Sequence, residues 1–149
     1  MVITIIAVLA GMVVPSIGGS DARRLGDAAR ELVLLTNRAR QEATLGMRIW
    51  RLVAEPGKGR YYFEKRQGGD FVRPRQSPFA GDRRTPGVEW DQLTINGQRA
   101  SGGGEVYLYP TGEQDTLDLI LRTGERVRAV VMDPVGRARV EKEPEGKSS

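Results

Sequence analysis

The chain has 149 residues, a net charge of +4, and neither histidine nor cysteine. These absences exclude disulfides, thiolate metal sites, the usual zinc sites and nucleophiles activated by histidine. Hydrophobic residues make up 39% and charged residues 28%, which is typical of one folded domain, although the first 20 residues are almost all apolar or small.

The opening segment, residues 1–19, carries no charged side chain. As a helix, its apolar run would measure roughly 25 Å, slightly less than the ~30 Å hydrocarbon core of a bilayer. A cleaved signal peptide, a buried core helix and a membrane stem are the three interpretations. In a stem, the lipid-facing residues would be Val2, Ile3, Ile5, Ile6, Val8, Leu9, Met12, Val13, Val14 and Ile17. A break or bend in the helix is expected at Gly11, Pro15, Gly18 and Gly19.

A membrane stem would continue directly into an amphipathic helix, and residues 20–46 have that pattern. Apolar residues recur at spacings of three, four and seven, which predicts one buried helix face that packs on a sheet. These residues are Leu25, Ala28, Ala29, Leu32, Leu35, Ala39 and Ala43. Ser20 is a candidate N-cap for this helix, and Gly46 is the expected end.

After Gly46 the hydrophobic period changes from 3.6 to 2. Strands are predicted at 47–55, 60–66, 87–96, 105–110, 115–122, 126–133 and 137–141. Turn residues separate several of them, among them Pro56–Gly59, Asn96–Gly97 and Thr123–Gly124. The predicted fold class is therefore α+β, with a long N-terminal helix packed against an antiparallel β domain over residues 47–141. Residues 142–149 are expected to form a flexible tail.

Two runs of sequence resemble a known family. VITIIAVLAGMVVPSI, followed by ARELVLLTNRARQEATLG, resembles the N-terminal helix of type IV pilins and type II secretion pseudopilins. RARQEATLGMRIWRLV, VYLYPTGEQDTLDLIL and GRARV are similar to one branch, the minor pseudopilin called general secretion pathway protein H and its type IV pilus relatives. The resemblance covers nearly the whole chain.

The resemblance implies a structural subunit with no cofactor, not an enzyme. The subunit would be a minor pseudopilin in the tip complex of the periplasmic pseudopilus of a type II secretion system. It would cross the bacterial inner membrane once and place its globular domain in the periplasm. Its implied partners are the other minor tip subunits, the major pseudopilin and the inner membrane, with a prepilin peptidase acting on the full-length precursor.

Members of this family begin with a short basic leader, a cleavage glycine and a Phe-Thr-Leu-Ile-Glu start. None of these precedes Val2 here, so we expect that translation begins upstream of Met1 or that the sequence is truncated. The methylated phenylalanine and the glutamate of the family therefore cannot be assigned to any residue of this sequence.

The alternative is a type IV pilus minor pilin that acts in pilus assembly or DNA uptake. Residues 58–84 hold eight Lys or Arg against three Asp or Glu, interleaved with aromatic residues, a composition that can bind nucleic acid. The candidate DNA-binding residues are Arg73, Arg75, Arg83 and Arg84. A solvated variable loop over a hairpin would have the same composition, and we favour that interpretation.

No motif predicts catalysis or metal binding, and we expect no catalytic and no metal-ligating residue. Gly102–Gly104 is not followed by the Lys-Ser/Thr of a phosphate-binding loop. The spacing of Glu113, Asp115 and Asp118 fits no standard cation loop. A secreted enzyme, the third class considered, would need a paired-carboxylate or Ser-Lys cleft, for which the sequence offers no convincing candidate.

Overall fold

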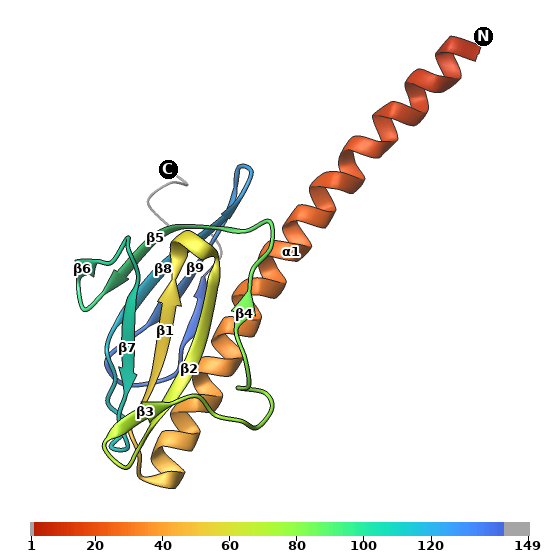
Figure 1. The fold of residues 1–149 in the computed structure, drawn as a ribbon. Helices are drawn as coiled ribbons and strands as arrows, with labels where there is room; N and C mark the ends of the chain where they lie inside the picture. Colours follow the sequence, from red (N-terminus) through yellow and green to blue (C-terminus); the bar gives the residue numbers. More distant parts are fainter. Residues whose placement is uncertain (1, 142–149) are drawn as a thin grey trace.

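The structure is a computed structural model that describes the backbone of residues 2–141 and the side chains of residues 20–141. It contains one long helix, α1 (Val2–Gly46), and ten strands in two five-stranded antiparallel sheets (Figure 1). The second half of α1 packs against both sheets, and the helix extends beyond them toward its N-terminus (Figure 1). This architecture confirms the predicted α+β fold class.

The first sheet has the strand order β3-β2-β1-β7, with β4 paired to β2. Its strands are β1 (Trp50–Glu55), β2 (Arg60–Gln67), β3 (Asp70–Val72), β4 (Arg83–Arg84) and β7 (Gly104–Leu108). A short 3-10 turn, Pro56–Lys58, joins β1 to β2, and Gly59 follows it with a φ of 60°. The glycine supplies the left-handed conformation that other residues adopt at a cost.

The second sheet has the strand order β10-β9-β8-β5-β6. Its strands are β5 (Glu89–Ile95), β6 (Gln98–Arg99), β8 (Leu117–Thr123), β9 (Arg126–Met132) and β10 (Arg139–Glu141). The predicted Asn96–Gly97 turn joins β5 to β6, with both residues at positive φ. Positive φ at both central residues is the requirement of the two-residue hairpin turn that matches strand twist.

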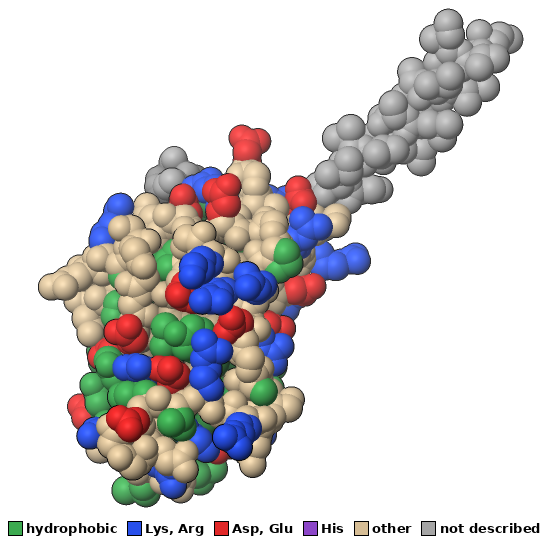
Figure 2. All heavy atoms as spheres, in the orientation of Figure 1, with side chains coloured by type: hydrophobic (Ala, Val, Ile, Leu, Met, Phe, Trp, Pro, Cys, Tyr) green, Lys and Arg blue, Asp and Glu red, His purple; other side chains and the backbone are tan. Residues whose placement is uncertain are grey.

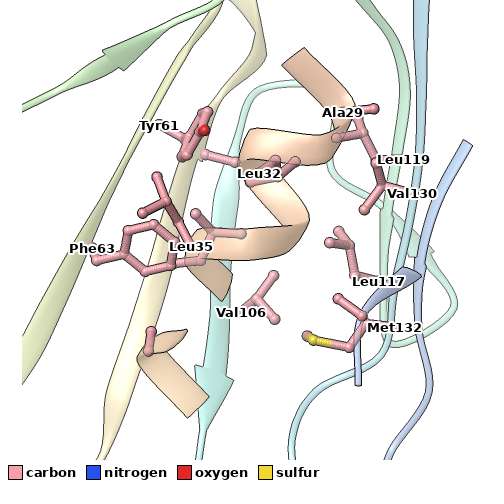
Figure 3. Close-up of a cluster of buried hydrophobic side chains, with 14 of the residues drawn as sticks. Ala29, Leu32, Leu35, Tyr61, Phe63, Val106, Leu117, Leu119, Val130 and Met132 are labelled. Atoms are coloured by element: carbon pink, nitrogen blue, oxygen red, sulfur yellow. The ribbon is translucent and has the colours of Figure 1, made fainter. Parts of the chain in front are cut away.

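The core lies where α1 covers the space between the sheets. In Figure 3, Ala29, Leu32 and Leu35 of α1 stand between Tyr61, Phe63 and Val106 of the first sheet and Leu117, Leu119, Val130 and Met132 of the second. Of the seven α1 residues predicted to pack on a sheet, six are buried and Ala28 is partly buried. Alanines on this face allow the close approach of the helix to the strands.

One helix spans both of the predicted N-terminal segments. Ser20, the candidate N-cap, lies inside α1, because helical residues precede it and an internal N–H group already has a carbonyl partner one turn earlier. The helix also runs through Gly11, Pro15, Gly18 and Gly19, and the bend expected there remains a prediction. The side chains of the predicted stem and the predicted tail at 142–149 lie outside the described residues.

The predicted end of the helix at Gly46 is confirmed, but the first strand starts at Trp50 instead of residue 47. Met47 has a φ of 53°, and the N–H of Arg48 donates to the carbonyl of Ala43 at 3.1 Å. This is the arrangement that closes many helices with a left-handed residue just past the end. Residues 47–49 therefore form the helix cap and connection, not strand.

Strands β3, β4 and β6 were not predicted, because two or three residues are too few to display alternation. For residues 126–133 the alternation alone does not indicate which face points inward. The register does: Val130 lies opposite Leu119 and Met132 opposite Leu117, and all four are buried.

Candidate functional site

The basic stretch 58–84 forms β2, β3, β4 and the loop between β3 and β4, so its charges lie on and beside the first sheet. Figure 2 shows Lys and Arg side chains in contact with Asp and Glu side chains over this face. Arg60 pairs with Glu55 and with Asp82, the latter at 2.8 Å. Arg73 pairs with the other carboxylate oxygen of Asp82 at 2.6 Å. Two of the eight basic side chains of the stretch, Arg60 and Arg73, are therefore held in close ion pairs within the chain.

The four candidate DNA-binding arginines have different surroundings. Arg73 and Arg75 line a shallow groove together with Lys65, and the guanidinium of Arg73 lies 3.5 Å from the ring centre of Tyr62. Arg83 instead donates to the carbonyl of Pro78 at 2.6 Å, and Arg84 lines a different groove beside α1. The four side chains therefore do not line one common groove.

Three of the five aromatic residues of the stretch are unavailable for stacking on bases, whereas Tyr62 and Phe71 are half-buried. Tyr61, Phe63 and Phe79 are buried in the core, where the ring of Phe79 packs edge-on against Trp50 with centroids 4.9 Å apart. Burial of this kind stabilises the fold and leaves no exposed ring face for a nucleobase. Most of the aromatic content of the stretch therefore belongs to the core.

Sequence reasoning missed the arginine–aromatic cluster on the outer face of the first sheet. Arg51 donates to Glu64 at 2.7 Å and to the hydroxyl of Tyr107 at 3.3 Å. Its guanidinium also lies 4.0 Å from the ring centre of Phe71. The available signal was the alternation of Arg51 with Trp50 and Leu52, which places Arg51 on the face opposite the core.

The other sequence candidates have structural roles. A Cβ added at Gly103 would meet the carbonyl oxygen of Ala54 at 2.7 Å, so this glycine allows the loop to lie close to β1. Asp115 accepts a hydrogen bond from the N–H of Tyr107 at 2.9 Å. This contact ties the turn that follows β7 back to that strand. Within residues 20–141, no group of three acidic side chains is placed to hold a metal ion.

The outer face of α1 is polar with two large apolar exceptions, Leu34 and Leu45, of which Leu45 is 81% exposed. Arg30 pairs with Asp27 at 2.5 Å on this face, and Leu34 beside them is 68% exposed. Among the described residues, no helix is both long and apolar enough to cross a membrane. Among the described residues of α1, Leu34 and Leu45 are the large apolar side chains exposed for contact with another protein.

The packing of one long helix on two antiparallel sheets matches two solved structures. The minor pseudopilin EpsH from the type 2 secretion system of Vibrio cholerae superposes with a TM-score of 0.65 and 13% identity, over 80% of this chain and 97% of EpsH. The chain has a pilin-like fold. The type IV minor pilin FimU of Pseudomonas aeruginosa gives a TM-score of 0.56 and 16% identity, over 86% of this chain and 94% of FimU. No protein-family model and no curated protein sequence matches the chain.

The two halves of α1 lie differently with respect to the sheets. The half that carries Leu32 and Leu35 is buried against the sheets and holds the globular domain together. The half that begins at Val2 extends away from the sheets (Figure 1). A helix that extends beyond its own domain has a face that only another molecule or a membrane can cover.

Proposed function

We propose that the chain is a minor pseudopilin, a structural subunit of the periplasmic pseudopilus of a type II secretion system, located in its tip complex. The observation that carries the proposal is α1, which packs on the sheets through one half and extends beyond them with the other. The extending half has an uncharged sequence over residues 1–19. Such a segment can lie in a bilayer and then exchange lipid for the stems of neighbouring subunits.

The proposal places the protein at the bacterial inner membrane, with one pass and the globular domain in the periplasm. Its partners would be the other minor tip subunits and the major pseudopilin, and a prepilin peptidase would process the precursor. The likeness to EpsH, which covers 97% of that chain, supports this proposal over an enzymatic role. Packing, and not catalysis, would then be the activity of the subunit.

The first test is the N-terminal sequence and intact mass of the native protein extracted from membranes. The proposal expects a mature start upstream of Met1 with an N-methylated phenylalanine. A soluble protein that starts between Gly18 and Ala22 would identify residues 1–19 as a cleaved signal peptide, and would contradict the proposal.

The second test is site-specific cross-linking. Because the chain has no cysteine, a single introduced cysteine is its only thiol. Leu34→Cys on the exposed face of α1 is expected to cross-link to another pilin-like subunit in membranes. Ser101→Cys, an exposed position in the loop before β7, is the matched control. Equal cross-linking from both positions would contradict assembly through α1.

The second candidate is a type IV pilus minor pilin, which the likeness to FimU favours. In a DNA-uptake role, Arg75 and Arg84 would carry the binding, because neither has an ion pair among residues 20–141. Substituting both with Gln should then lower the slope of log affinity against log salt by about one per lost phosphate contact. Under the first proposal, we expect instead that the chain binds DNA weakly and that these two substitutions do not change the binding.

A further inference from the structure

A groove of about 790 Å³ lies at the end of the globular domain where α1 terminates. Three segments line it: Met47–Ile49 after the helix, Arg66 with the Gly68–Gly69 turn, and the Tyr109–Gln114 turn after β7. In Figure 1 this end of the domain lies opposite the end toward which the N-terminal half of α1 extends. A subunit held by its helix would leave this groove free to contact another protein.

Hydrogen bonds fix one wall of the groove. The N–H of Gly112 donates to the carbonyl of Tyr109 at 3.0 Å, and the N–H of Tyr109 donates to the carbonyl of Glu113 at 2.9 Å. Gln114, which is buried, donates through Nε2 to the carbonyls of Asp133 at 2.7 Å and Gly136 at 2.6 Å. A wall fixed in this way loses little conformational entropy when a ligand binds.

The helix end presents apolar side chains beside the groove. Met47 occupies the left-handed position of the cap, which costs a residue other than glycine about 1 kcal/mol. Its side chain is nevertheless 75% exposed, and that of Leu45 is 81% exposed. An exposed methionine can adapt its flexible thioether side chain to a partner.

The charge of the groove is positive. Arg48 and Arg66 are both exposed, and neither is in an ion pair among the side chains of residues 20–141. Arg51, Arg60 and Arg73 on the nearby face are all paired with carboxylates. Glu113 is the one acidic residue among those that line the groove. The groove therefore combines apolar contact area with two guanidinium groups that can donate hydrogen bonds to carboxylates.

We propose that this groove docks an acidic, aliphatic peptide segment of a partner protein. Aliphatic side chains of the segment would pack on Met47, Ile49 and Tyr109, and its carboxylates would pair with Arg48 and Arg66. The inference rests on the proposed function only for the identity of the partner as a component of the same secretion assembly. The binding chemistry follows from the groove.

The test is a titration of the full-length chain, in detergent, followed by NMR of its ¹³C-labelled methionine methyl groups. The probe is a short capped peptide of leucine and glutamate, compared with peptides of leucine and lysine and of serine and glutamate. The leucine–glutamate peptide is expected to shift the Met47 methyl resonance and to bind more tightly than either other peptide. Met132, which is buried in the core, is the internal reference and should not shift.

Charge-matched variants give the decisive comparison. Replacing Arg48 and Arg66 with Gln should weaken binding about fivefold, since two exposed ion pairs of roughly 0.5 kcal/mol each contribute about 1 kcal/mol together. Replacing Arg99 and Arg126 with Gln removes the same charge at exposed positions outside the groove, and should leave binding unchanged. Equal binding of the glutamate and lysine peptides, equal loss in both double variants, or an unshifted Met47 would each overturn the proposal. Because the titration requires no assembly, any of these failures leaves the subunit proposal standing.

Discussion

Asn37 of α1 forms two hydrogen bonds with the backbone of Ala138, 101 residues later in the chain. Its Nδ2 donates to the Ala138 carbonyl at 3.1 Å, and its Oδ1 accepts from the Ala138 N–H at 2.8 Å. Ala138 is buried and comes directly before β10. One amide side chain therefore attaches the C-terminal part of the second sheet to the helix.

Replacing Asn37 with Ala should lower the free energy of unfolding by about 1–3 kcal/mol, because it leaves a buried N–H and carbonyl without partners. Urea unfolding followed by circular dichroism measures the change. Gln41→Ala, an exposed position on the same helix, is the control and should change stability by less than about 0.5 kcal/mol. Similar losses of stability in the two variants would mean that the two hydrogen bonds of Asn37 do not contribute to the free energy of unfolding.

Leu32 and Leu34 allow a comparison of buried and exposed leucines two positions apart. Leu32 is buried between the sheets (Figure 3). Leu34, in contrast, is largely exposed. Leu32→Ala should cost about 2–5 kcal/mol through lost burial and a residual cavity, and Leu34→Ala should stay within about 0.5 kcal/mol. Both values come from the same unfolding measurement. A large loss for Leu34→Ala would indicate that α1 presents the opposite face to the sheets.

Met47→Gly should raise the free energy of unfolding by about 1 kcal/mol. Glycine adopts the left-handed conformation of the helix cap without the steric cost that methionine incurs. Leu45→Gly, two residues earlier and within α1, is the matched control. It should lower stability by up to about 1 kcal/mol, because glycine is a poor helix former. If Met47→Gly also destabilises, the exposed methionine contributes packing within the isolated subunit.

Stability should fall at alkaline pH because of Tyr61. Burial, and then the negative charge of the nearby Glu31, raise the pKa of the Tyr61 hydroxyl above its ordinary value of about 10. The folded state therefore holds this proton more tightly than the unfolded chain, and stability falls as the pH rises above about 10. Urea unfolding at a series of alkaline pH values measures the slope.

Tyr61→Phe removes the titrating group and should flatten this alkaline slope. Tyr62→Phe is the control, because Tyr62 lies on the outer face of the same strand under Arg73, and it should leave the slope in place. An unchanged slope in Tyr61→Phe would assign the alkaline loss to other groups.

Much of the fold follows from local sequence patterns. The 3.6-residue period identified the buried face of α1, since residues such as Ala39 and Ala43 are spaced to share one side of a helix. Glycines and short turn motifs marked the hairpins. The strands β3, β4 and β6 were missed because two or three residues show no alternation. For β4 the pairing also depends on a neighbour that is distant in sequence, since Arg60 lies opposite Arg84.

The surface chemistry was less accessible from sequence. A count of charges in 58–84 cannot show that Arg73 and Arg60 share Asp82, because pairing depends on the register of β2 and the path of the following loop. Asn37 likewise looks like any polar helix residue until the chain brings Ala138 to it. In both cases the deciding partner lies in another element, and local periodicity carries no information about it.

The chain alternates between the two sheets: β1 to β4 enter the first, β5 and β6 the second, β7 returns to the first, and β8 to β10 complete the second. During synthesis, β1 therefore keeps an open edge until Leu108 has been made, and an open edge readily pairs with other chains. Neither sheet is encoded by one continuous part of the sequence. A cut in the loop between β6 and β7 would yield two fragments, each with strands of both sheets and neither with a complete one.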